Sequence, residues 1–126
     1  MTATSKPKSK PMPKLDYVEF ASTNLAASKT FFKAVFAWQF EDYGDAYSAI
    51  IGAGLDGGIF AAESVQVAAK GAPLLVFLSD EIELTQSLVE EHGGKISQAI
   101  FDFPGGRRFH FIEPGGNELA VWTKAD

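Results

Sequence analysis

The chain has 126 residues, 46% hydrophobic and 13% aromatic, which is enough to bury the core of one domain. It contains no cysteine, which excludes disulfides, thiolate metal sites and a cysteine nucleophile. Its net charge of −5 argues against a nucleic-acid partner. Because no apolar run approaches the roughly 20 residues of a membrane span, we expect no membrane partner and a cytoplasmic location.

Residues 1–14 mix lysine, proline and serine, and we expect them to form a flexible tail. Without the four lysines of this segment, seven basic residues remain against 16 acidic ones, so the rest of the chain carries about −9. We expect residues 15–126 to form a single domain of two modules, at about 15–72 and 73–126.

The first half predicts a strand, a helix and three short strands. Residues 17–21 alternate in polarity, as a half-buried strand does. Residues 22–24 offer side-chain oxygens that can cap a helix, and apolar residues then recur at helical spacing up to position 36. Glycine and aspartate turns separate three further strands, at 38–43, 46–51 and 57–62.

The second half repeats this order. A wholly apolar strand at 74–78 precedes a helix for which Asp80 is the expected cap and Glu83 the partner in a capping box. Three more strands are expected at 96–100, 107–112 and 118–123. The buried stripe of the helix is expected to consist of Ile82, Leu84, Leu88 and Val89. The sequence therefore predicts an α+β fold in which the order βαβββ is used twice.

Five segments in this order resemble the vicinal oxygen chelate superfamily, which includes glyoxalase I, bleomycin-resistance proteins, fosfomycin-resistance proteins and extradiol dioxygenases. The segments are Tyr-Val-Glu-Phe at 17–20, Val-Phe-Ala-Trp-Gln-Phe at 35–40, Gly-Gly-Ile at 57–59, Glu-His-Gly-Gly at 91–94 and Glu-Pro-Gly-Gly-Asn at 113–117. The resemblance implies two βαβββ modules with curled mixed sheets around a cleft, usually completed in a homodimer. It is greatest to the small, glyoxalase-like proteins of a single unit.

Enzymes of that superfamily place one metal ligand, usually His or Glu, on each of four strands. The matching positions in this sequence are Tyr17, Phe60, Leu74 and Ala120. A phenol is a poor ligand at neutral pH, and the other three side chains have no donor atom. We therefore expect no metal and no other cofactor, and we do not expect the metal chemistry of the isomerases and dioxygenases.

Strand alternation assigns a set of side chains to the expected cleft. Glu19 and His110 are the candidate catalytic residues. His110 could act as a general base or bind a carboxylate, or it could be a half-buried His with one structural partner. Glu19 could pair with Arg108 or His110, or accept a cationic ligand. The expected ligand-binding residues are Tyr17, Phe60, Leu74, Val76, Arg108, Ala120 and Trp122.

Three functions remain open from the sequence. The first is a metal-independent protein of the bleomycin-resistance type that holds a flat or cationic small molecule in an apolar, aromatic cleft. The second is a glyoxalase-like lyase or isomerase that moves protons with Glu19 or His110. The third is a structural or partner-binding module whose cleft is filled by its own side chains. A homodimer is expected in each case.

Overall fold

The computed structural model describes residues 12–126, so residues 1–11 of the expected tail lie outside the described part. The first module contains β1 (Tyr17–Ser22), α1 (Leu25–Phe36), β2 (Gln39–Asp42), β3 (Tyr47–Ile51) and β4 (Asp56–Ala61). A connection that includes the short 3-10 helix η1 (Ala68–Lys70) leads to the second module. This contains β5 (Leu75–Leu78), α2 (Ile82–Glu91), β6 (Lys95–Phe103), β7 (Gly106–Ile112) and β8 (Glu118–Lys124). The predicted α+β fold, with βαβββ used twice, is confirmed.

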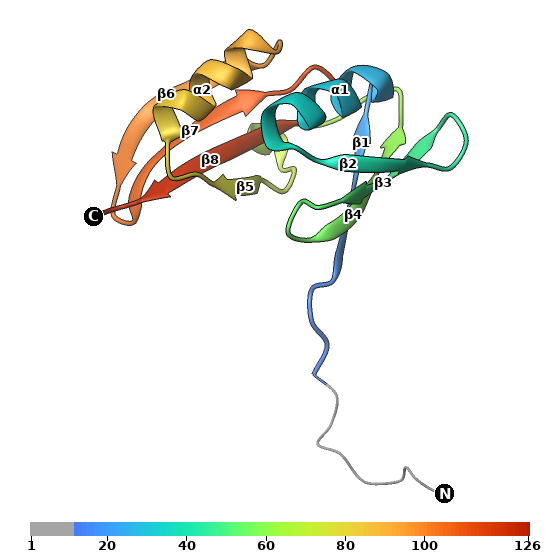
Figure 1. The fold of residues 1–126 in the computed structure, drawn as a ribbon, viewed down its shortest axis with the longest axis horizontal. Helices are drawn as coiled ribbons and strands as arrows, with labels where there is room; N and C mark the ends of the chain where they lie inside the picture. The colour runs from blue at the N-terminus through green and yellow to red at the C-terminus, as the bar shows by residue number, and fades with distance from the viewer. Residues whose placement is uncertain (1–11) are drawn as a thin grey trace, which may run out of the picture.

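Each module forms its own four-stranded mixed sheet, with the orders β1-β4-β3-β2 and β5-β8-β7-β6. In both, the first strand runs parallel to the last strand of its module, and the remaining pairs are antiparallel. The sheets are not joined, so β1 and β5 are open edges. Figure 1 shows both helices on one side of the molecule. Neither helix of the described part is long and apolar enough to span a membrane.

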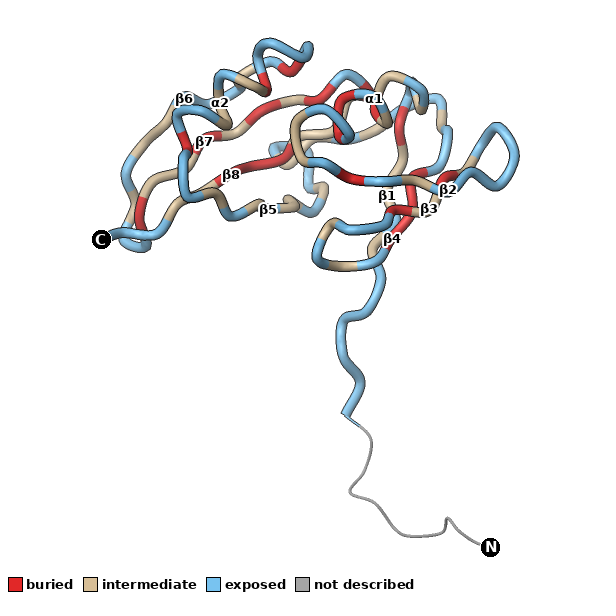
Figure 2. Tube along the Cα trace, viewed as in Figure 1, coloured by how far each residue is buried: buried red, intermediate tan, exposed pale blue. Residues whose placement is uncertain are grey.

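The two modules share one hydrophobic core, because α1 packs against both sheets. The ring of Phe31 lies 5.7 Å from that of Phe111 in β7, and the ring of Phe36 stacks on Phe77 in β5. Figure 2 shows buried residues along α1 and along β7 and β8, the two strands that lie beneath the helices. Burial of these aromatic side chains stabilises the contact between modules.

The start of α2 differs from the predicted capping box. The N-cap residue is Glu81, and its side chain makes no capping hydrogen bond. Ser79 Oγ instead accepts a hydrogen bond from the backbone N–H of Glu81 at 3.0 Å, so a local serine turn replaces the expected Asp80 cap. Glu83 accepts a hydrogen bond from Arg107 Nη1 at 2.7 Å and does not reach back to the helix start.

The predicted buried stripe of α2 was wrong at Leu84, whose side chain is 53% exposed. Ile82 and Val89 are the fully buried residues of this helix. At about 100° per residue, Leu84 lies roughly 200° around the helix from Ile82, and so faces solvent when Ile82 faces the sheet. One narrow stripe is sufficient because this short helix packs on a single surface.

A buried carboxylate ties the turn between β7 and β8 to the first module. Glu113 is only 1% exposed, and its oxygens accept hydrogen bonds from Ser28 Oγ of α1 and from the backbone N–H of Gly115, both at 2.7 Å. They also accept from the backbone and side-chain nitrogens of Asn117, at 3.2 and 2.7 Å. Asn117 Nδ2 donates in turn to the carbonyl oxygen of Ala21 in β1, at 2.7 Å. The motif at 113–117 therefore fixes the position of β1 relative to β8.

Candidate functional site

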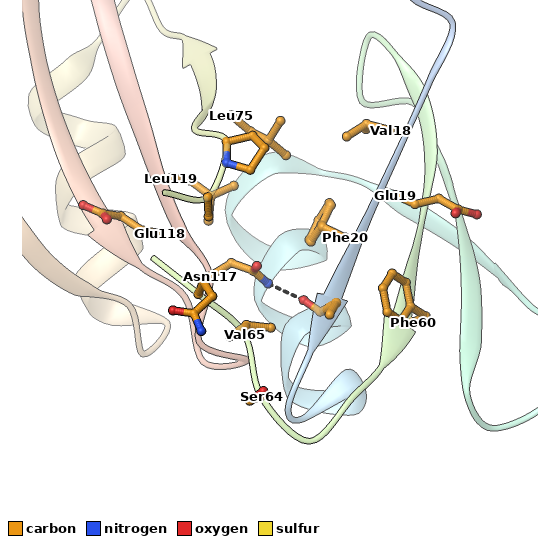
Figure 3. Close-up of a pocket in the computed structure, with 14 residues that line it drawn as sticks. Val18, Glu19, Phe20, Phe60, Ser64, Val65, Leu75, Asn117, Glu118 and Leu119 are labelled. Atoms are coloured by element: carbon orange, nitrogen blue, oxygen red, sulfur yellow. Dashed lines mark hydrogen bonds between the residues drawn. The ribbon is translucent and has the colours of Figure 1, made fainter. Parts of the chain in front are cut away.

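A cavity of about 360 Å³ lies between the modules, beside the open edges of β1 and β5. It is lined by residues of β1, β4, β5 and β8 and by the connection between β4 and β5. Figure 3 shows Val18, Phe20, Leu75 and Leu119 grouped around its centre. Such an apolar interior with few polar groups suits an apolar small molecule.

Polar side chains lie at the borders of this cavity. Asn117 closes one end, where the hydrogen bond from its side chain to Ala21 is drawn in Figure 3. Glu19 and Glu118 line the cavity on opposite sides, and in Figure 3 their carboxylates point away from its centre and from each other. A ligand in the apolar interior therefore meets carboxylates only at its margins.

Glu19 belongs to a hydrogen-bonded group on the face of the first sheet. Tyr47 OH donates to Glu19 Oε2 at 2.9 Å, and the phenol oxygens of Tyr17 and Tyr47 lie 2.5 Å apart. The hydrogen bond with Tyr17, followed by burial and by the hydrogen bond to Glu19, raises the pKa of Tyr47 above its ordinary value. Tyr47 lies across Gly58, because a Cβ at position 58 would stand 1.9 Å from the phenol oxygen. The partner of Glu19 is therefore Tyr47, where the sequence had suggested Arg108 or His110.

His110 and Arg108 lie on the helix-free face of the second sheet. His110 Nδ1 is 3.5 Å from Glu118 Oε2, and both side chains are largely buried. Glu118 is held from two other directions, by the backbone N–H of Ala68 at 2.9 Å and by Ser97 Oγ at 3.3 Å. The arrangement supplies His110 with a carboxylate partner at the border of the cavity.

The residues assigned to one cleft from the sequence are divided among three places. Phe60 and Glu19 line the cavity, with Tyr17 beside Glu19. Val76, on β5, lines a neighbouring hollow of about 310 Å³, and Leu74 precedes that strand without lining either space.

The other four expected residues lie together on the second sheet. They form two opposed pairs across β7 and β8, which are Arg108 with Trp122 and His110 with Ala120. Alternation assigns each residue to a face of its own sheet, but it does not fix how the two sheets are oriented. Within one chain these faces do not form a single cleft.

Several cavity residues were not expected from the sequence. Leu75 and Leu119 alternate with the residues expected in the cleft and so lie on the other face of their strands, yet they reach the cavity because it opens at the sheet edges. Val65 lies in the connection, where no periodicity distinguishes it. Asn117 follows two glycines in a turn, so the one available signal was its place in the motif at 113–117.

Residues 14–121 match the sequence profile of the Glyoxalase/Bleomycin resistance protein/Dioxygenase superfamily. The match covers most of the chain and agrees with the two βαβββ modules described above. The chain belongs to this superfamily. A search of curated protein sequences finds no significant match.

Several solved structures, one of them of a glyoxalase/bleomycin resistance protein/dioxygenase family enzyme, are similar in fold. A family enzyme from Burkholderia phytofirmans has a TM-score of 0.75 and 14% identity, over 90% of this chain and 100% of that one. The fosfomycin resistance protein FosX from Mesorhizobium loti has a TM-score of 0.72 and 15% identity, over 91% and 95%. TnmS3, an antibiotic-binding protein from a Streptomyces strain, has a TM-score of 0.66 and 14% identity, over 92% and 99%.

The residues present do not fit the metal site that superfamily enzymes use. At the four matching positions Phe60, Leu74 and Ala120 offer no donor atom, and the phenol of Tyr17 is engaged with Tyr47. Within residues 12–126, no group of three or more His, Asp or Glu side chains is placed to hold an ion. The donor chemistry of this superfamily member thus differs from that of its metal-dependent relatives.

Proposed function

We propose that this protein is a metal-independent small-molecule-binding member of the superfamily, which holds an apolar ligand in the cavity between its modules. The observation that carries the proposal is the apolar cavity of about 360 Å³. This volume lies in the range of about 300–1,000 Å³ typical of ligand sites. The antibiotic-binding function of TnmS3, which has the same fold, supports the proposal.

The apolar side chains that line the cavity favour binding by apolar contact. Val18, Leu75 and Leu119 present only hydrocarbon, and each Å² of apolar surface removed from water contributes roughly 25 cal/mol. The open space argues against a cleft filled by its own side chains. The polar side chains at the borders of the cavity, Asn117, Glu19 and Glu118, are engaged in hydrogen bonds within the protein.

A second candidate function is proton transfer to or from the ligand, without a metal. Glu19 lines the cavity while its carboxylate accepts a hydrogen bond from Tyr47, and His110 has Glu118 as a partner at the opposite border. Either pair could serve a lyase or isomerase as acid and base. In this case Glu19→Gln or His110→Ala abolishes turnover and leaves ligand binding intact.

We also propose that the protein is a homodimer. Val76 and Leu78 are 44% and 55% exposed, side by side on the open edge strand β5. Exposed apolar side chains on an unpaired strand are a surface that another copy of the chain can cover. The helix-free faces of the two sheets would then acquire new neighbours.

The binding proposal is tested with the neutral fluorophore N-phenyl-1-naphthylamine and a cavity-filling substitution. Val65 lines the cavity and Val67 does not, although both are half-buried in the same connection. We expect wild type and Val67→Phe to bind the probe at one site per chain, and Val65→Phe to lose this binding at least tenfold. Equal binding by the two variants, or none by wild type, contradicts the proposal.

A further inference from the structure

The side-chain amide of Asn117 stands at one end of the cavity between the modules, directly before β8. Its Nδ2 donates two hydrogen bonds at 2.7 Å, one to the carbonyl oxygen of Ala21 and one to Glu113 Oε2. Both partners are acceptors, because Glu113 Oε2 also accepts from the backbone N–H of Asn117. The nitrogen of the amide must therefore face them, and this fixes the orientation of the whole group.

The oxygen of this amide is left without a partner. Because the amide is planar and its nitrogen is held at β1, Oδ1 lies on the other side of Cγ, and Figure 3 shows it turned to the interior of the cavity. Within residues 12–126 no N–H or O–H group donates to Asn117 Oδ1, and the unpartnered side-chain atom that these residues enclose is Arg108 Nε. Asn117 Oδ1 is therefore not enclosed, and a molecule in the cavity can reach it.

The two carboxylates at the borders of the cavity do not take this part. Glu19 accepts a hydrogen bond from Tyr47, and Glu118 accepts one from the backbone N–H of Ala68. In Figure 3 both carboxylates point away from the centre. Asn117 thus provides an uncharged acceptor beside an apolar interior, which suits a neutral donor better than a cation.

We propose that the cavity selects neutral aromatic molecules that carry a hydrogen-bond donor, such as phenols or indoles, and that Asn117 Oδ1 accepts this donor. This selection rests on the proposed function, since it concerns the ligand of the same cavity. Phe20 and Phe60 line the cavity and can pack against an aromatic ring. A donor that enters the apolar interior loses its hydrogen bonds to water, and Oδ1 restores one of them. A fixed acceptor therefore favours the ligand that bears the donor over an isostere that lacks it.

Two ligands of nearly the same shape give opposite expectations. 2-Naphthol and 2-methylnaphthalene are both neutral at pH 7, and they differ by a hydroxyl in place of a methyl group. If Oδ1 accepts the hydroxyl proton, 2-naphthol binds more tightly, by about tenfold or more. If the cavity is only apolar, 2-methylnaphthalene binds more tightly, because the hydroxyl is desolvated without a partner. Displacement of N-phenyl-1-naphthylamine measures both affinities.

Nuclear magnetic resonance assigns the acceptor without a substitution, which matters because loss of the Asn117 amide would also release Ala21 and Glu113. The chain contains two asparagines, Asn24 and Asn117, so protein labelled with ¹³C at asparagine Cγ gives two signals. Oδ1 of Asn24 caps α1 and lies outside the cavity, which makes it an internal control. We expect 2-naphthol to shift the Asn117 signal downfield and to leave that of Asn24 in place. 2-Methylnaphthalene should shift the Asn117 signal much less.

The two ligands also separate failure of the selection from failure of the cavity. If neither naphthalene nor N-phenyl-1-naphthylamine binds, the proposed function is wrong, and the selection with it. Tighter binding of 2-methylnaphthalene supports the cavity and overturns the selection of donors. A preference for 2-naphthol without a shift at Asn117 assigns the acceptor to another group and also overturns it. Val65→Phe, which fills the cavity, should abolish the Asn117 shift, whereas Val67→Phe should keep it; a shift that survives in Val65→Phe places the ligand elsewhere and contradicts the proposal.

Discussion

The ring of Phe36 stacks on the ring of Phe77, with centroids 4.0 Å apart and planes inclined by 10°. Phe36 ends the helix of the first module, and Phe77 lies in the first strand of the second. The pair therefore joins the two modules, beside the hollow of about 310 Å³ that Phe77 lines. We expect the placement of the cavity walls to depend on this contact and on the hydrogen bonds of Glu113.

Replacement of Phe36 by Ala should lower the free energy of unfolding by about 2–4 kcal/mol, because the side chain is partly buried and its removal leaves a gap against β5. Urea unfolding measures the change. Leu84→Ala, at an exposed apolar position of α2, should cost no more than about 0.5 kcal/mol. Equal effects of the two substitutions would show that the contact between modules is not what stabilises the fold.

The Glu113→Gln substitution should destabilise the protein by about 2–4 kcal/mol. The side chain of Glu113 accepts all four of its hydrogen bonds. The amide of Gln would instead place its own N–H donors against some of these donors. Thermal unfolding measures the effect, with the exposed Glu63→Gln as the charge-matched control. A shift no larger than that of the control would mean that the network contributes little to the attachment of β1.

A methyl group at position 58 should displace the phenol of Tyr47 and break its hydrogen bond to Glu19, at a cost of about 1–3 kcal/mol. The test is a double-mutant cycle of Gly58→Ala with Tyr47→Ala. Because the clash involves the Tyr47 ring, Gly58→Ala should cost much less in the Tyr47→Ala background. An unchanged cost would assign the requirement for glycine to the backbone.

The stability of the protein should depend on pH through Asp42. The hydrogen bond from Lys29 Nζ at 2.8 Å, followed by that from Ser48, holds the pKa of Asp42 below its ordinary value. A lowered pKa in the folded state adds stability above the unfolded pKa, near 4, and this contribution is lost as pH falls through the lowered value. Wild type should therefore exceed Asp42→Asn in stability at pH 7, by a small amount because the pair is exposed, and the difference should vanish at strongly acidic pH. Urea unfolding measured across this pH range tests the prediction, with Asp45→Asn as the control substitution.

The proposed dimer should appear as a species of twice the chain mass in sedimentation equilibrium at micromolar concentration. Leu78→Asp should convert it to a monomer, because the charge would be buried without a partner. Leu84→Asp is the matched control, since Leu84 is 53% exposed but lies on a helix. A monomeric wild type, or equal dissociation by both variants, rejects the interface at β5.

The sequence was informative wherever one residue type served a local role. Asn24 does cap α1, with its Oδ1 accepting from the backbone N–H of Ala27 at 3.1 Å. The cap of α2 was wrong because Ser79 and Asp80 both carry suitable oxygens, and the position of the first helical turn decides which one is used. The motif at 113–117 is recognisable in the sequence, but its buried Glu113 pairs with Ser28, 85 positions away.

By itself the sequence determined the two βαβββ modules, the faces of their strands and the lack of metal-ligating side chains at the superfamily positions, because periodicity and donor chemistry are properties of single residues and their neighbours. Only the tertiary structure decided which faces meet. It placed Glu19 beside Tyr47, His110 beside Glu118, and the guanidinium of Arg108 over the ring of Phe103. The physical reason is that the orientation of one sheet relative to the other is set by the packing of α1 across both, a long-range contact that no local pattern encodes.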